Sequence, residues 1–128
     1  MEDFLKGIDF DGEIILKELG AWMDGGTITL ELVDINHQAF EITICQTMTL
    51  GINSLNGTWI PGTFRLNDVE IPIRSDSEKK ILNALKALKF SDNIPSKSRP
   101  LERELINSRI AFVESQEYLK IATQMGRL

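Results

Sequence analysis

Few residues in this sequence could catalyse a reaction. It contains one histidine, His37, and one cysteine, Cys45. One chain therefore cannot assemble a zinc site from several Cys and His ligands, and no nucleophile stands beside His37 in the sequence. We expect His37 to lie in a turn and Cys45 to be a small packing residue within a strand. The sequence thus predicts no catalytic residues.

Two aspartates near the N-terminus, Asp9 and Asp11, come closest to a metal-binding motif. Carboxylates two residues apart could share a divalent cation through their oxygen atoms. The spacing does not continue as a calcium-binding EF-hand loop, because Ile14 stands where that loop requires glycine. We predict no bound metal, and we interpret Asp11 as the N-cap of a helix and Asp9 as a solvated side chain. A carboxylate-based, metal-dependent enzyme that uses both aspartates is the alternative.

Glycine-rich and nucleophile motifs of common enzymes are missing from the sequence. No Gly-x-Gly-x-x-Gly motif follows a predicted strand, and neither a Walker-type phosphate-binding loop nor a Gly-x-Ser-x-Gly motif occurs. We therefore expect no cofactor and predict that the protein is not an enzyme.

The composition is typical of one globular domain. The chain has 128 residues, of which 42% are hydrophobic and 26% are charged, and its net charge is −5. A chain of this length can bury a sizeable core, so we expect residues 1–128 to form a single α+β domain. The charge is uneven, because residues 1–74 contain 12 acids and 4 bases whereas residues 75–128 contain 7 acids and 10 bases.

Charge and hydropathy also restrict the partners. An acidic protein is repelled by nucleic-acid phosphates, and the small basic cluster of Lys97, Arg99 and Arg103 contains no aromatic residue that could stack on bases. No apolar run approaches the roughly 18 residues of a membrane-spanning helix, so we expect no membrane partner. The N-terminus lacks the basic and apolar regions of a secretory signal, which predicts a cytoplasmic protein.

The spacing of apolar residues predicts the secondary structure. Ile15, Leu19 and Trp22 are spaced as on one side of an amphipathic helix, which we expect over residues 11–23. Alternating apolar and polar residues predict strands near 27–32, 40–50, 60–66 and 69–73. We expect a four-stranded antiparallel sheet of two hairpins, with the strand that contains Pro72 at an edge.

Two helices are expected after the strands. Ser75 and Glu78 match a capping box, which predicts a helix over residues 76–90. Pro100 fits the first turn of a final helix, roughly 100–125. The apolar residues of this final helix form two stripes, Leu101, Leu105, Phe112 and Leu119 on one side and Ile106, Ile110, Val113 and Ile121 on the other. Both stripes could face the interior, or one could contact a second copy and form a homo-oligomer.

The sheet surface is then the main candidate site. Its face opposite the predicted core is polar and acidic, and it includes a tryptophan, a residue type that often anchors interfaces. We predict a small acidic protein-binding module, such as an immunity-type inhibitor that covers the basic active site of a toxin or enzyme. A self-associating structural protein is an alternative. The expected binding residues are Trp59, Glu31, Glu41, Glu70, Asp9 and Asp11.

Overall fold

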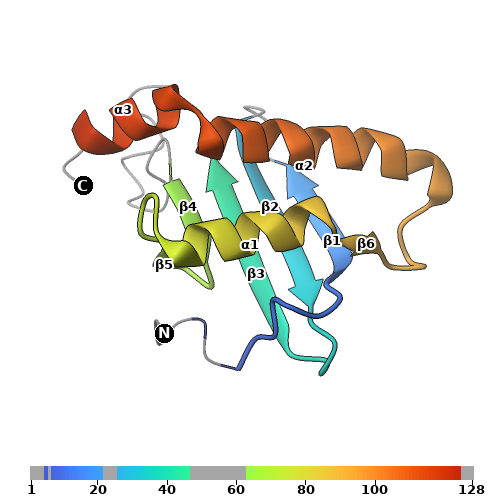
Figure 1. The fold of residues 1–128 in the computed structure, drawn as a ribbon. Helices are drawn as coiled ribbons and strands as arrows, with labels where there is room; N and C mark the ends of the chain where they lie inside the picture. The colour runs from blue at the N-terminus through green and yellow to red at the C-terminus, as the bar shows by residue number, and fades with distance from the viewer. Residues whose placement is uncertain (1–4, 6, 22–25, 47–62, 125–128) are drawn as a thin grey trace.

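A mixed β-sheet is the framework of the protein. The computed structural model describes residues 5, 7–21, 26–46 and 63–124, whose arrangement is shown in Figure 1. The six described strands have the order β5-β4-β3-β2-β1-β6, and neighbours are antiparallel except for β1 and β6, which are parallel. The strands are β1 (Ile15–Ala21), β2 (Thr27–Val33), β3 (Ala39–Cys45), β4 (Thr63–Leu66), β5 (Val69–Glu70) and β6 (Lys89–Phe90).

Three α-helices in the described part of the chain pack with this sheet. They are α1 (Asp76–Lys86), α2 (Arg99–Glu114) and α3 (Gln116–Gln124), and a short 3₁₀ helix, η3 (Ser96–Ser98), precedes α2. Figure 1 shows α1 and α2 crossing one face of the sheet. The α+β class expected from the sequence is therefore confirmed.

The core lies between the helices and the apolar side of the sheet. Leu30 of β2 pairs with Ile42 of β3, and Ile42 pairs with Leu66 of β4, so buried side chains line up across the strands. On the helix side, Ile81 and Leu85 of α1 are buried in the same cluster. This burial follows from the alternation of apolar and polar residues along the strands, which places every second side chain on one face.

The segment expected to be an N-terminal helix is a strand. A β-bulge shifts the register of β1 between Leu16 and Glu18, so that Leu16 pairs with Leu32 and Leu19 pairs with Leu30. The bulge therefore places two leucines three residues apart on the same face, a spacing that resembles helical periodicity. Asp11 consequently caps no helix. Trp22 lies outside the described residues.

The predicted sheet was also too small. The four expected strands correspond to β2, β3, β4 and β5, which form two antiparallel hairpins, and the structure adds β1 and β6 on one side. The strand expected around Pro72 lies at a sheet edge, as proposed, but ends at Glu70. The part of the second predicted strand (40–50) beyond residue 46, and the start of the third (60–66) before residue 63, lie outside the described residues.

The helix after the hairpins begins where the sequence indicated and ends early. The Ser75 hydroxyl oxygen accepts a hydrogen bond from the Glu78 amide at 3.0 Å, as a capping box requires. The helix ends at Lys86, and the Lys89 amide then donates to the Ile14 carbonyl at 2.9 Å, which starts β6. The prediction that the helix continues to residue 90 was wrong because β1 offers an unpaired edge to these residues.

The final helix is broken at Ser115. The Ser115 hydroxyl donates to the Phe112 carbonyl at 2.6 Å and accepts from the Tyr118 amide at 3.1 Å, so one side chain ends α2 and begins α3. The break lets residues of both predicted stripes contribute to the core, since Phe112 of one stripe and Ile110 of the other are buried. The stripe that contains Phe112 is less covered, because Leu105 and Leu119 are half-buried and Leu101 is 71% exposed.

Candidate functional site

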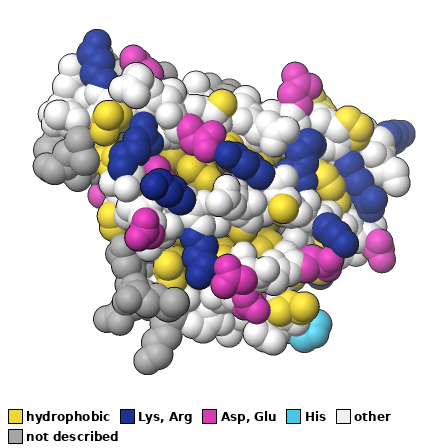
Figure 2. All heavy atoms as spheres, viewed as in Figure 1, with side chains coloured by type: hydrophobic (Ala, Val, Ile, Leu, Met, Phe, Trp, Pro, Cys, Tyr) yellow, Lys and Arg dark blue, Asp and Glu magenta, His cyan; other side chains and the backbone are white. Residues whose placement is uncertain are grey.

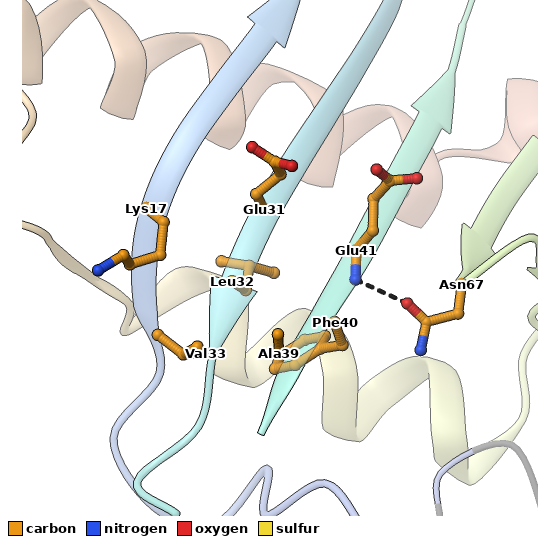
Figure 3. Close-up of a pocket in the computed structure, with 8 residues that line it drawn as sticks. All are labelled: Lys17, Glu31, Leu32, Val33, Ala39, Phe40, Glu41 and Asn67. Carbon is orange, nitrogen blue, oxygen red and sulfur yellow. Dashed lines mark hydrogen bonds between the residues drawn. The ribbon is translucent and has the colours of Figure 1, made fainter. Parts of the chain in front are cut away.

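The sheet face opposite α1 and α2, here called the open face, is polar. Its side chains alternate with the buried core residues along each strand, so the register places them in rows. No described helix covers this face, which is seen in Figure 3 with the helices behind the strands. The described residues of the open face include Glu18, Gly20, Thr29, Glu31, Val33, Ala39, Glu41 and Arg65. Thr27, Thr43 and Cys45 lie on the same side of the sheet but are buried.

Three glutamates form one row across the open face. Glu18 of β1 pairs with Glu31 of β2, and Glu31 pairs with Glu41 of β3. We call these three residues the carboxylate row. Neighbouring strands lie about 4.8 Å apart, and like charges placed directly opposite each other destabilise a sheet. The row therefore concentrates negative charge at a cost to the fold.

The electrostatics of the carboxylate row centre on Glu31. A hydrogen bond that the protonated Glu31 carboxyl group donates to the Glu18 carboxylate, together with the charge of Glu18, is the main cause that raises the pKa of Glu31, and the charge of Glu41 adds to it. Each of these causes favours the protonated form of Glu31 or disfavours its charged form. A cation placed near the row would relieve the repulsion.

A groove of about 460 Å³ adjoins the carboxylate row. Val33 and Ala39, which are cross-strand neighbours, form its apolar floor, and Glu31 and Glu41 stand at one end. In Figure 3 the two glutamate side chains extend side by side from neighbouring strands, with Lys17 on one flank. The groove thus combines an apolar floor with two acidic groups, which suits the stem and the head of a lysine or arginine side chain.

Asn67 forms the opposite flank of the groove. It lies in the β4–β5 turn with a φ of 47°, a left-handed conformation that asparagine tolerates. Its side-chain oxygen accepts a hydrogen bond from the Glu41 amide at 2.8 Å. The contact ties the turn to β3 and fixes this wall of the groove.

The structure brings together only part of the predicted site. Glu31 and Glu41 are direct neighbours, whereas Glu70 lies on the edge strand β5, opposite Arg65 and one row away. The sequence missed Glu18 as a member of the row because the residue was assigned to a helix. Trp59 lies outside the described residues.

The carboxylates of Asp9 and Asp11 interact with groups close to the N-terminal turn. One carboxylate oxygen of Asp9 accepts hydrogen bonds from the amides of Asp11 and Gly12 at 3.0 and 3.1 Å. The Asp11 carboxylate lies 3.5 Å from the Lys80 ammonium group. Within the described ranges, no three His, Cys, Asp or Glu side chains are placed to share a metal ion. The two aspartates therefore organise the N-terminal turn and are separate from the open face.

Asp34 is a buried acid that the sequence did not single out. It is 2% exposed, and its carboxylate accepts hydrogen bonds from the amides of Asp9, Asn36 and Gln38 at 2.8–2.9 Å. Burial alone would raise the pKa of Asp34, but the three amides and the nearby His37 bring it below its ordinary value. Asp34 thus fastens the N-terminal segment to the β2–β3 turn, where His37 adopts a φ of 64°.

Two arginines of the basic cluster hold the fold together. Arg103 donates to the carbonyls of Leu85 and Leu88 at 3.1 and 2.6 Å, which satisfies one acceptor in the last turn of α1 and one just after it. Arg99 donates to the carbonyls of Ile94 and Ser91 at 3.1 and 3.2 Å. Since their guanidinium groups are engaged in the fold, these arginines do not form an open phosphate-binding patch.

The helix side of the protein has a different charge pattern. Figure 2 shows Lys and Arg side chains spread over α1 and α2 among acidic ones, with apolar atoms between them. The carboxylate row has no such mixture, because its three members carry the same sign.

Comparisons with protein-family models, with curated proteins and with solved structures found no match. None of the helices in the described part of the chain has the length and apolar character needed to cross a membrane. The case for function therefore rests on the geometry of the open face.

Proposed function

We propose that the protein is a protein-binding module whose open face docks on a basic surface of its partner. The carboxylate row of Glu18, Glu31 and Glu41 carries this proposal. The three side chains repel one another in the free protein, and a cationic partner surface would replace that repulsion with attraction. Residues that lower stability without an internal compensation are typical of functional surfaces.

The groove supports the same proposal. Its apolar floor at Val33 and Ala39 could bury the stem of a basic side chain while Glu31 and Glu41 bind the charged head. Desolvated pockets that accept one anchor side chain contribute much of the affinity of protein interfaces. The arrangement therefore fits a partner that inserts a lysine or arginine.

An immunity-type inhibitor is the concrete form of this proposal. Such a protein would cover the basic active site of a toxin or enzyme with its acidic sheet and so block the substrate. The net charge of −5 and the acidic row support this role, because opposite charges steer two proteins together and accelerate their association.

The test compares two triple variants of equal net charge. Glu18→Gln, Glu31→Gln and Glu41→Gln remove the row, and Asp92→Asn, Glu104→Gln and Glu117→Gln remove three exposed acids elsewhere. A partner isolated from native lysate by affinity capture is titrated against both variants and the wild type by calorimetry. We expect the row variant to lose about 1–3 kcal/mol of binding free energy and the control to lose little. Equal affinities for the two variants would refute the proposal.

A further inference from the structure

We propose that the outer edge of β1, from Glu18 to Ala21, pairs with an extended basic segment of the partner, which adds a strand to the sheet. The inference rests on the proposed function, because the segment belongs to the same basic partner. It specifies the mode of recognition, in which main-chain hydrogen bonds supply affinity and alternating side chains supply specificity.

The pairing of β1 changes along its length. Its first two residues, Ile15 and Leu16, pair with β6 on the outer side. The bulge at Lys17 follows, and from Glu18 to Ala21 the strand pairs with β2 alone among the described strands. This half of β1 is therefore a sheet edge whose outward amide and carbonyl groups can accept another strand.

The side chains along this edge leave it accessible. Glu18, Gly20 and Ala21 are exposed, and Leu19 is half-buried against the core. Among the described residues, a Cβ atom added at Gly20 would meet nothing within 4 Å, so their packing does not require glycine there. Glycine inside a strand weakens it, and it often marks a place where another backbone comes close.

Charge identifies the occupant. The carboxylate row ends at this edge with Glu18, which has the acidic Glu31 on one side and no described strand on the other. An added strand would place a side chain opposite Glu18 on the open face. A lysine or arginine at that position would put a positive charge next to the carboxylate row, as favourable cross-strand pairs require. The next side chain of the added strand would lie beside Leu19, where an apolar residue is favoured. The segment should therefore alternate basic and apolar residues.

A second copy of the chain fits this edge less well. Antiparallel pairing of two β1 strands centred on Glu18 would place the two carboxylates opposite each other. Pairing centred on Leu19 would set Glu18 against Gly20 of the other copy and supply no cation. Each copy also carries a net charge of −5, so association brings like charges together.

The experiment uses three synthetic hexapeptides as probes with ¹⁵N-labelled full-length protein. The first alternates arginine and valine, the second is the same peptide with every second amide N-methylated, and the third replaces arginine with glutamate. We expect the arginine peptide to shift the amide signals of residues 18–21 and slow their hydrogen exchange. N-methylation should weaken binding about tenfold, because it removes main-chain hydrogen bonds on one side of the peptide. The glutamate peptide should not bind.

Variants separate edge pairing from docking on the face. Glu18→Gln should weaken the arginine peptide several-fold, whereas the control Glu104→Gln should not. Equal binding of the first two peptides, or no binding of the arginine peptide, would overturn the edge proposal. The proposal would also be overturned if the protein formed a homodimer without peptide and the amides of residues 18–21 exchanged slowly in it. A second copy of the chain would then pair with this edge. The proposed function is tested separately, by the calorimetry of the two triple variants with the captured partner.

Discussion

Glu31 lies directly opposite Glu18 on the neighbouring strand, and the hydrogen bond that a protonated Glu31 can donate to Glu18, with the charge of Glu18, raises the pKa of Glu31. Because the folded pKa lies above the ordinary value of 4.5, the favourable contribution of Glu31 is complete below pH 4.5 and is lost as the pH rises through the folded pKa. At neutral pH the charged Glu31 therefore destabilises the fold.

Replacing Glu31 with glutamine should stabilise the protein at pH 7. We expect a gain of about 0.2–1 kcal/mol in the free energy of unfolding, limited by solvent screening at this exposed position. The gain should disappear below pH 4.5, where the wild-type side chain is also neutral. Urea denaturation of both proteins at pH 7 and pH 4 measures the difference. A loss of stability at pH 7 would show that the row is not repulsive.

Asp34→Asn should have the opposite effect. The aspartate accepts three backbone hydrogen bonds in a buried site, and asparagine offers only one acceptor oxygen, so we expect a loss of about 1–3 kcal/mol at pH 7. The lowered pKa means that the stabilisation is present above pH 3.8 and is lost as the pH falls through the folded pKa. The difference between wild type and variant should therefore shrink in acid.

Thermal melts at several pH values, with the exposed Asp92→Asn as control, test this prediction. The control replaces the same side chain at a site without these hydrogen bonds. If Asp34→Asn and Asp92→Asn lose equally little stability, the three amide contacts do not fasten the N-terminal segment.

Arg74 should be essential where α2 ends. Its guanidinium group donates to the carbonyls of Val113 and Ser115 at 2.7 and 2.8 Å, and it lies 3.3 Å from the carboxylate of Glu78, which is only 3% exposed. Arg74→Met leaves these acceptors and the buried acid without their partner, so we expect a loss of about 3–5 kcal/mol. Part of the loss comes from the uncompensated charge of Glu78.

A double-mutant cycle separates the two contributions. With Glu78→Gln as the background, Arg74→Met should cost at least about 1 kcal/mol less than in the wild type. Chemical denaturation of the four proteins gives the coupling energy. Additive losses would mean that the helix-end carbonyls, and not the ion pair, account for the role of Arg74.

The fold was predictable where local patterns agreed with tertiary structure. The alternation of residues 27–32 predicted β2, and Ser75 with Glu78 predicted the start of α1. β1 was not predictable in this way, because the bulge at Lys17 gives Leu16 and Leu19 a helical spacing. β6 was hidden for another reason, since two residues gain strand geometry only through pairing with β1.

The candidate site was predictable in part for similar reasons. Glu31 and Glu41 stand on the polar side of two alternating strands, so their shared face follows from the pattern. The participation of Glu18 depends on the register across the bulge, which no local pattern contains. At the break between α2 and α3, Arg74, which is distant in sequence, adds hydrogen bonds to the carbonyls of Val113 and Ser115.

Gly20 offers a test of whether the edge of β1 is shaped by the fold or by a partner. A Cβ atom there meets nothing within 4 Å in the described part of the chain, so Gly20→Thr should fit the folded backbone and raise the free energy of unfolding by about 0.5–1 kcal/mol. Gly12→Ala is the matched control, because its Cβ would lie 3.1 Å from Ile35 and 3.2 Å from Asp9 and should destabilise the turn. Urea denaturation measures both. A destabilised Gly20→Thr would mean that the glycine serves the fold itself, whereas a stabilised one leaves the partner as the reason for its presence on an exposed strand.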